Sequence, residues 1–363
     1  MKILFIGPMP EPITGQSIAC KILHDDLVKR NDLTVINLSR KGLNSGNTTF
    51  QRVFEVFKIF ISIFRNRNRV DVTYLTVSES FVGCLKDLLI LLILFPHLNK
   101  VAIHLHGGAG MLRLMQNKSL MMSAYKLMLQ RIGAVIILGE RHRDIYKNHV
   151  AVNKIHIVPN FAIDSLYCPK SIIDRKYGDL KKINILFLSN LLPGKGYKEL
   201  ISSIRELGSN IRQEYIFNIV GGFESMLDSV EFKNSIIGME EVHYHGILTG
   251  KDKIDVFWDA HIFILPTYYP FEGQPISILE AYASGCVVVT TDHSGIFDIF
   301  NPSLNGFQVL PRSTESLTNL LHEIPKRRDE LLRIATANRN MAESFYRQEI
   351  FCERVSQILD MVN

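Results

Sequence analysis

Short apolar runs alternate with amphipathic stretches along most of the chain. The runs are rich in Val, Ile and Leu and have few polar interruptions, which is typical of strands buried on both faces of a parallel sheet. The expected strands are Ile3–Ile6, Leu33–Asn37, Val72–Thr76, Val101–His104, Val135–Leu138, Ile155–Val158, Ile183–Leu188, Tyr215–Val220, Val242–Tyr244, Ile262–Leu265 and Val287–Thr290. Helices between successive strands would cover the sheets. The pattern therefore predicts an α/β protein.

The alternation restarts after the sixth expected strand, which predicts two Rossmann-like domains. We expect an N-terminal domain at 1–163, a charged linker at 164–182 and a C-terminal domain at 183–344, followed by an amphipathic terminal segment at 345–363. Open α/β sheets bind ligands beyond the carboxyl ends of their strands. The expected ligand site is therefore a cleft formed by these ends of both sheets.

The composition is that of a globular protein with sizeable cores. Of 363 residues, 47% are apolar and 21% are charged, which fits two folded α/β domains. Five Cys are scattered without a Cys-x-x-Cys pair, which argues for a reducing compartment and against disulfides or a zinc site. Met1 and Lys2 lead directly into the first expected strand without the pattern of a signal peptide, so we expect a cytoplasmic location.

Positive charge is concentrated in the first half of the chain. Residues 1–160 contain 21 Lys and Arg against 10 Asp and Glu, whereas the remainder contains 20 against 26. This asymmetry predicts an anionic partner or surface for the first half. No RNA-binding motif accompanies the charge, so we do not expect a nucleic-acid partner.

Two apolar helical stretches in this half have alternative interpretations. Phe81–Phe95 is too short to cross a membrane, which takes about 20 residues, so a buried helix is expected and a membrane-facing helix is the alternative. Phe50–Phe64 has an aromatic apolar face and ends in the basic segment Arg65–Arg69. This stretch predicts either a core-facing helix with a solvated basic end or an attachment to an anionic membrane surface.

The candidate chemistry centres on two acids around a helix start. Glu272 precedes the expected helix Ile276–Ser284, and Glu280 lies within it; Gly273, Gln274 and Pro275 stand between, with Pro275 expected as the first helical residue. A helix N-terminus offers free N–H groups and positive potential to a phosphate, and the two acids can accept hydrogen bonds from hydroxyls. The segment predicts a hydroxyl-rich anionic ligand, although two Glu alone are more often solvated acids.

The same segment, FEGQPISILEAYASG, resembles the signature of retaining GT-B glycosyltransferases of family 4. That family has two Glu with the spacing of Glu272 and Glu280, usually within Glu-Gly-Phe-Gly, where this chain has Glu-Gly-Gln-Pro. The resemblance implies that Glu272 and the following backbone hold a donor sugar and that Glu280 holds the ribose of a sugar nucleotide. Pro275 removes one backbone donor, for which the amide of Gln274 can compensate.

A second segment, NILFLSNLLPGKGYKELISSI, resembles the Gly-Arg-Leu-x-x-x-Lys-Gly motif of the same family. Lys195 is placed to pair with a diphosphate near a helix start, but Asn190 stands where the family has Arg. Arg141 or Arg143 is a candidate replacement for that missing cation. No Ser or Thr follows Lys195 as in a P-loop, which disfavours ATP hydrolysis.

Three further segments complete the resemblance. Gly15 and Gln16 follow the first strand, where backbone N–H groups can meet phosphate or sugar, and Gly246 and Ile247 correspond to the base-binding loop. His106 lies in a His-Gly motif that implies a polar orienting role near the sugar. The implied catalytic residues are His106, Lys195 and Glu272. The implied substrate-binding residues are Gly15, Gln16, Asn190, Gly246, Ile247, Gly273, Gln274, Pro275, Ile276, Ser277 and Glu280.

Histidines at i and i+2 raise the possibility of a metal site. His104 and His106 form one such pair and His243 and His245 form another, but a metal needs a third ligand and nothing in the sequence links the two pairs. We therefore expect no metal. VPNFAID at 158–164 resembles the family's crossover between domains and is interpreted as hinge structure.

The resemblance implies a GT-B fold, with an acceptor-binding first domain, a nucleotide-sugar-binding second domain and a terminal helix that returns to the first. It implies a retaining, metal-independent transfer of a sugar from a nucleotide diphosphate sugar, with uracil expected as the base, to a glycan or lipid-linked hydroxyl. Surface polysaccharide synthesis, at the cytoplasmic membrane face, is the expected context, and no cofactor is expected. The alternatives are a nucleotide-sugar epimerase and a non-catalytic binding subunit with the same fold.

Overall fold

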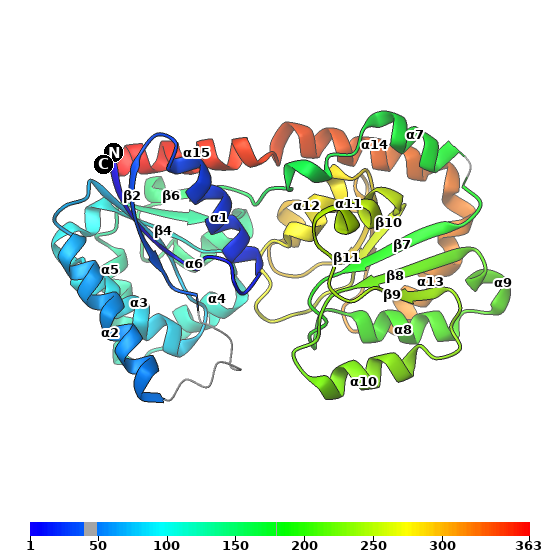
Figure 1. Ribbon diagram of the computed structural model, residues 1–363, viewed down its shortest axis with the longest axis horizontal. Coiled ribbons are helices and arrows are strands. Elements are labelled where there is room, and N and C mark those ends of the chain that lie inside the picture. Colours follow the sequence, from blue (N-terminus) through cyan, green and yellow to red (C-terminus); the bar gives the residue numbers. More distant parts are fainter. Residues whose placement is uncertain (40–48, 179) are drawn as a thin grey trace. The chain divides into compact units, whose positions relative to one another are not determined.

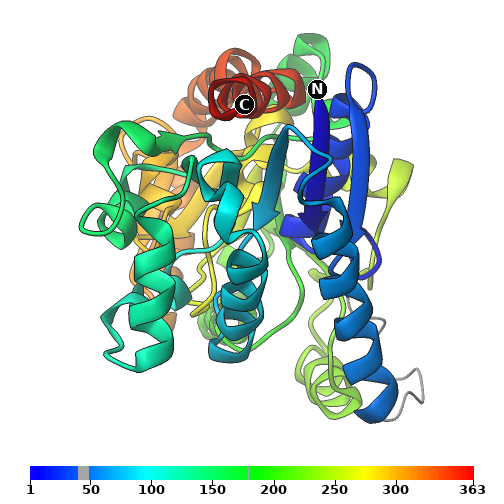
Figure 2. The same ribbon diagram turned by 90° about the vertical axis from the view of Figure 1, so that its left-hand side faces the viewer.

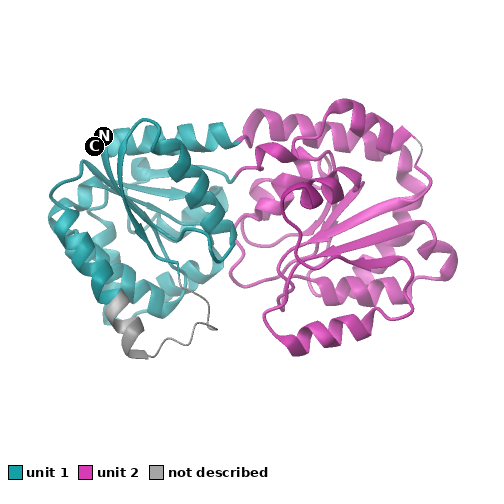
Figure 3. Cartoon of the chain, viewed as in Figure 1, with its two compact units in different colours: residues 1–160, 348–363 teal, residues 161–347 magenta. Residues whose placement is uncertain are grey.

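The protein folds into two compact units, each built on a six-stranded parallel sheet (Figure 3). The computed structural model describes residues 1–39, 49–178 and 180–363; for residues 49–55 it describes the backbone alone, so the first side chains of the expected aromatic helix lie outside the description. The first unit comprises residues 1–160 and 348–363, and the second comprises residues 161–347. The predicted α/β class with two parallel sheets is confirmed.

The first sheet has the strand order β2-β1-β3-β4-β5-β6. Its strands are β1 (Lys2–Gly7), β2 (Asp32–Asn37), β3 (Val72–Thr76), β4 (Val101–His104), β5 (Ala134–Ile137) and β6 (Ile155–Ile157). Its helices are α1 (Gly15–Leu27), α2 (Thr49–Asn66), α3 (Phe81–Ile93), α4 (Ala109–Gln116), α5 (Leu120–Leu129), α6 (Arg143–Tyr146) and α15 (Gln348–Val362), with the short 3₁₀ turns η1 (Phe95–Lys100), η2 (Glu140–His142) and η3 (Val152–Lys154). Helices α1 and α15 cover one face, and α2, α3 and α5 lie in a row on the other (Figures 1 and 2). This double cover explains why the strands are apolar throughout.

Helix α3 is only half buried, which corrects the expectation of a buried helix. One side packs into the first core, through Cys84, Leu88, Ile90 and Leu91. The opposite side is also apolar but exposed, and it consists of Phe81, Val82, Leu85, Leu89 and Leu92. No helix in the described part of the chain combines the length and hydropathy needed to cross a bilayer.

The second sheet has the strand order β12-β11-β10-β7-β8-β9. Its strands are β7 (Ile183–Leu188), β8 (Tyr215–Val220), β9 (Val242–Tyr244), β10 (Ile262–Leu265), β11 (Val287–Thr291) and β12 (Gly306–Val309). Its helices are α7 (Lys170–Gly178), α8 (Tyr197–Glu206), α9 (Ser209–Arg212), α10 (Met226–Ser235), α11 (Gly250–Asp259), α12 (Ile276–Ala283), α13 (Thr314–Glu323) and α14 (Arg328–Phe345), with η4 (Asp164–Leu166), η5 (Ile296–Asp298) and η6 (Ile324–Arg327). Strand β12 was not among the expected strands. Its first residue, Gly306, has φ 149° and passes so close to Val288 that a Cβ would lie 1.9 Å from the Val288 carbonyl oxygen.

The segment expected to be a linker, 164–182, is part of the second unit. It contains η4 and α7, and Ile173 and Tyr177 are buried in the second core. The Tyr177 hydroxyl donates to the carbonyl oxygens of His261 at 2.7 Å and Gly285 at 3.1 Å. The Lys176 ammonium donates to two further carbonyls, at 2.7 and 2.9 Å, and burial lowers its pKa. The boundary between the units lies instead after Asn160, inside the VPNFAID segment.

The order of strands reverses once in each sheet. The point of reversal is where a ligand can bind to a sheet of this kind. The reversal lies between β1 and β3 in the first sheet and between β7 and β10 in the second. At such a point the loops that follow adjacent strands run in opposite directions and leave a crevice at the carboxyl edge of the sheet. Both sheets therefore have a natural binding position there.

We predict that Tyr177→Phe lowers the free energy of unfolding by about 1–3 kcal/mol, because the buried hydroxyl contacts to the His261 and Gly285 carbonyls are lost. Asp174→Asn, at an exposed position of the same helix, is the matched control and should change it by less than about 0.5 kcal/mol. Urea unfolding followed by circular dichroism measures both. An unchanged stability in Tyr177→Phe would mean that α7 is not docked on the second core.

Candidate functional site

A buried ion pair lies at the point where the second sheet reverses its strand order. Lys195 comes from the loop after β7 and Glu272 from the loop after β10. The Lys195 ammonium donates to Oε2 of Glu272 at 2.7 Å, and the Thr267 hydroxyl donates to the same oxygen at 3.0 Å. Glu272 is 7% exposed. Two of the three predicted catalytic residues, 77 positions apart, are thus in direct contact.

Glycines on both sides of Lys195 allow the two loops to meet. Gly194 and Gly196 have φ values of 93° and 87°, and a Cβ on Gly196 would lie 2.4 Å from the Pro266 carbonyl oxygen. The Gly194 carbonyl accepts from the backbone N–H of Tyr268 at 2.7 Å. The Lys195 side chain is held over the Tyr269 ring, 4.7 Å from its centroid. The backbone therefore fixes where the ammonium can be.

The Glu272 loop also forms hydrogen bonds with the segment after β11. The Ser294 hydroxyl donates to the Glu272 carbonyl at 2.7 Å, and the Gly295 N–H donates to the Gly273 carbonyl at 3.1 Å. Gln274 is buried next to these contacts. The acid and the residues after it are therefore held by three separate segments of the second unit.

Helix α12 begins beside this loop with an uncapped N-terminus. Pro275 is its N-cap, with φ −61° and ψ 119°, and not its first helical residue as expected; the helix ends at Ala283, one residue earlier than expected. No side chain caps it, and the first-turn N–H groups of Ile276 and Ser277 have no acceptor within a helix. These N–H groups and the helix dipole give the site a positive potential suited to an anion.

The second predicted acid, Glu280, has a partner that the sequence did not indicate. Glu280 lies on α12 and is 2% exposed, and its Oε1 accepts from the Lys253 ammonium at 2.7 Å. Lys253 lies on α11, 27 residues away, and only the fold brings the two together. The site therefore holds two Lys–Glu pairs, each with its carboxylate almost fully removed from water.

The remaining predicted residues of the second unit lie on the same edge of the sheet. Gly246 follows β9 with φ 68°, and its carbonyl accepts from the Gly221 N–H, after β8, at 2.8 Å. Ile247 is 73% exposed. Asn190 follows β7 and is exposed. These loops lie side by side because β7, β8 and β9 are neighbouring parallel strands.

His106, Gly15 and Gln16 belong to the first unit. The His106 ring lies 4.0 Å from that of the buried His104, centroid to centroid, and burial lowers the pKa of His106 to about 4. Its imidazole is therefore neutral at physiological pH and only weakly basic, which suits an orienting role better than proton abstraction. Gly15 opens α1, whose N-cap Thr14 forms a capping box with Ser17.

The glycine after His106 makes room for a side chain of the protein itself. A Cβ on Gly107 would overlap the carboxylate of Glu79, which accepts from the Met111 N–H of α4 at 3.2 Å. This contact, rather than an open approach for a ligand, requires the glycine. The sequence offered no signal for it.

The remaining predicted features are the candidate arginines and the histidine pairs. Arg143, a candidate replacement for the missing Arg, lies in the first unit and forms an ion pair with Glu140 at 2.6 Å. His245 shares a hydrogen bond with Asn218 at 2.8 Å. Within residues 1–39, 49–178 and 180–363, no three His, Cys, Asp or Glu side chains are grouped as metal ligands.

Residues 170–341 match the family model described as glycosyl transferases group 1, and this range contains both Lys–Glu pairs. Most of the second unit is thus similar to group 1 glycosyltransferases. The predicted resemblance is thereby confirmed for this part of the chain.

Curated relatives are consistent with that assignment. The chain is 26% identical over 252 residues to the N,N'-diacetylbacillosaminyl-diphospho-undecaprenol α-1,3-N-acetylgalactosaminyltransferase of Campylobacter jejuni, an alignment that covers 66% of this chain and 63% of the relative. It is 28% identical over 155 residues to the mannosylfructose-phosphate synthase of Agrobacterium fabrum, which covers 39% and 34%. The chain thus spans less than two thirds of either relative.

Solved structures show the GT-B fold for the whole chain. Sucrose-phosphate synthase of Thermosynechococcus elongatus superposes with a TM-score of 0.73 at 14% identity, covering 99% of this chain and 98% of that one. HepE of Anabaena in complex with UDP superposes with a TM-score of 0.74 at 15% identity, covering 99% and 100%. The predicted GT-B architecture is confirmed.

We predict that Gly196→Ala destabilises the second unit more than Gly238→Ala does. Both positions have positive φ, which costs a non-glycine residue about 1–2 kcal/mol, but only at Gly196 would the methyl group also displace the Pro266 backbone. Urea unfolding of the two variants compares them. An equal loss would show that the loop after β7 does not need its close approach to the loop after β10.

Proposed function

We propose that the chain is a retaining glycosyltransferase that moves a sugar from a nucleotide diphosphate sugar to a hydroxyl of a glycan or lipid-linked acceptor. The observation that carries this proposal is the Lys195–Glu272 pair beside the free N-terminus of α12, within a group 1 domain. The UDP complex of the HepE structure supports a uridine nucleotide as donor. The Campylobacter relative, by its name, acts on a diphospho-undecaprenol acceptor, which supports a lipid-linked acceptor and a place in surface polysaccharide synthesis.

The proposed donor contacts follow from the two ion pairs. When the diphosphate enters, the Lys195 ammonium exchanges the Glu272 carboxylate for phosphate, and the N–H groups of Ile276 and Ser277 add hydrogen bonds. Glu272 then accepts hydrogen bonds from the sugar, and Glu280 accepts from the ribose hydroxyls. Lys253 holds the Glu280 carboxylate in place.

In the proposed reaction, the bond between the anomeric carbon and the phosphate oxygen breaks while a bond to the acceptor oxygen forms on the same face. Lys195 and the α12 N-terminus stabilise the charge that develops on the leaving diphosphate, without need of a metal. The leaving phosphate oxygen takes the acceptor's proton. Neutral His106 orients a sugar hydroxyl.

We predict that one of UDP, GDP and ADP binds the native protein in EDTA and that Lys195→Met weakens this binding at least about tenfold, because an ion pair with phosphate is lost. Glu280→Ala should weaken it as well. Lys198→Met, three positions past the loop lysine at an exposed position, is the control and should bind normally. Titration calorimetry measures all four proteins. Binding of none of the three nucleotides would contradict the donor site.

Turnover distinguishes transfer from the two alternatives. A nucleotide sugar should be consumed with a sugar appearing on the acceptor, and Lys195→Ala and Glu272→Ala should abolish this while remaining folded. Interconversion of two nucleotide sugars without acceptor would indicate an epimerase. Nucleotide binding without any turnover would indicate a non-catalytic subunit.

We also propose that the first unit contacts an anionic membrane surface through α2, α3 and α5. The exposed apolar side of α3 continues onto its neighbours through Phe57 and Phe64 of α2 and Leu127 of α5. The exposed cations Arg65, Arg69 and Arg131 lie on or next to these helices. Each basic residue near an anionic leaflet contributes about 1 kcal/mol, and the apolar side chains add burial at the interface.

We predict that the native protein sediments with vesicles containing phosphatidylglycerol and that the double variant Leu85→Glu/Leu89→Glu loses at least about ten times in affinity, since two charges would enter the interface. Met226→Glu/Leu227→Glu, at two exposed apolar positions of α10 in the second unit, is the matched control and should bind as the native protein does. Equal losses in both variants, or no binding of the native protein, would refute the assignment of this face.

A further inference from the structure

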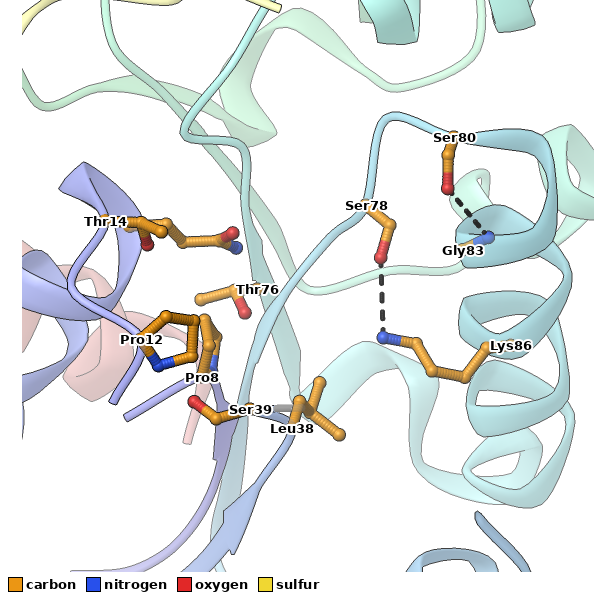
Figure 4. Close-up of a pocket in the computed structure, with 11 residues that line it drawn as sticks. Pro8, Pro12, Thr14, Leu38, Ser39, Thr76, Ser78, Ser80, Gly83 and Lys86 are labelled. Carbon is orange, nitrogen blue, oxygen red and sulfur yellow. Dashed lines mark hydrogen bonds between the residues drawn. The ribbon is translucent and has the colours of Figure 1, made fainter. Parts of the chain in front are cut away.

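A polar cavity of about 300 Å³ lies at the carboxyl edge of the first sheet, at its own point of strand reversal (Figure 4). The segments after β1, β2 and β3 enclose it, together with the first turns of α3. Its polar lining consists of Thr14, Gln16, Ser39, Thr76, Ser78, Ser80 and Lys86. This is the position where an open α/β sheet binds a ligand, and none of the contacts proposed for the donor uses it.

The lining is positive and contains no carboxylate among the described residues. Lys86 contributes an ammonium, which lies 3.4 Å from the Ser78 hydroxyl. The N-caps of two helices, Thr14 of α1 and Ser80 of α3, reach the same cavity, so two helix dipoles add their positive ends to the Lys86 charge.

The two acids of this region do not face the cavity. Asp87 is fully buried; it accepts from the Ser78 N–H at 2.7 Å, lies 3.1 Å from the Lys86 ammonium, and burial raises its pKa. Glu79 instead accepts from the Met111 N–H of α4. Asp87 therefore holds Lys86 and the loop after β3 in place. Neither acid fills the cavity, so a ligand can accept hydrogen bonds there.

One buried hydroxyl in the lining has no oxygen or nitrogen partner. Thr76 is 2% exposed, and its Oγ1 makes no hydrogen bond to such an atom in the structure. Its polar neighbour is the thiol of Cys20, which is a weak donor and whose pKa burial raises to about 12. Since buried polar groups are nearly always satisfied, a ligand oxygen in the cavity is the natural partner for Thr76.

We propose that this cavity binds a phosphate group of the acceptor, with Lys86 as the cation and the hydroxyls of Thr76, Ser78 and Ser80 as donors. The proposal rests on the proposed function, since it assigns the acceptor's chemistry. Helix α3 supports it: Gly83 and Lys86 line the cavity, while Val82 and Leu85 of the same turns belong to the exposed apolar side. A phosphate in the cavity would thus lie next to a surface that takes an apolar chain.

Binding of pyrophosphate to the Lys195→Met variant tests the cavity of the first unit separately from the proposed donor site. In this full-length variant, inorganic pyrophosphate should still bind by titration calorimetry. A further Lys86→Gln should weaken it at least about tenfold, since a charge-assisted contact is lost, and Lys86→Arg should retain it within about threefold. Lys118→Gln, an exposed lysine of the same unit, is the control and should leave it unchanged. Thr76→Val should weaken it severalfold.

The outcomes separate the cavity from the donor site. Lys86→Gln alone should leave the affinity for nucleotide within twofold of that of the native protein. If the native protein binds no nucleotide, that result counts against the proposed function and not against the cavity. No pyrophosphate binding in Lys195→Met, or equal binding in the Lys86→Gln and Lys118→Gln variants, would overturn the cavity proposal. Farnesyl diphosphate identifies the source: tighter binding than pyrophosphate points to a lipid diphosphate, and equal binding to a phosphate without a lipid chain. Thermal unfolding verifies that each variant is folded.

Discussion

The buried contact between Lys195 and Glu272 determines how the site of the second unit is built. Removing two charges from water costs several kcal/mol per ion, and their attraction offsets this only if the geometry is fixed. Gly194, Gly196 and Thr267 provide that fixation by joining the two loops through backbone contacts. In the proposed donor complex, an incoming diphosphate would replace one anion with another at a lysine that is already desolvated and in position. Its affinity would then reflect the difference between phosphate and carboxylate as partners, not the full strength of either contact.

Glu280 of α12 and Lys253 of α11 form a second such ion pair, which limits what the site can attract. Both acids carry an ammonium partner, so neither presents an uncompensated negative charge to a diphosphate. The N-terminus of α12 has neither a capping side chain nor an N–H on Pro275, and it is left as the positive end of the site. A ligand with phosphate at one end and hydroxyls at the other matches this order of charges, because its phosphate meets the helix end while its hydroxyls donate to the two carboxylates.

The sequence was sufficient to predict most strands of the two sheets and to single out Glu272 and Glu280. It was not sufficient to predict the contacts between segments distant in sequence. Runs such as Val287–Thr290 are apolar throughout because both faces are covered, so they were recognisable, whereas β12 has only four residues and begins with Gly306. Segment 164–182 was misinterpreted because charged residues surround Ile173 and Tyr177, the two that dock α7. Lys253 and Glu79 could not be assigned, because each meets its partner through loops or helices distant in sequence. Helix α3 has apolar residues both on the side that faces the core and on the exposed side, so its composition could not reveal that one of these sides is exposed.

The two units differ in how far family resemblance can explain them. The second contains recognisable motifs, because a lysine, two acids and a helix start stand there at the sequence positions that the family pattern has. In the first unit, the cavity at the strand reversal is lined by hydroxyls from three separate loops and by Lys86, which Asp87 orients from behind. Single Ser and Thr residues in loops have no recognisable spacing, so only the fold reveals that they converge. The same α3 carries both the cavity lysine and an exposed apolar side, so the proposed selectivity for a lipid-linked acceptor would depend on that helix and its neighbours.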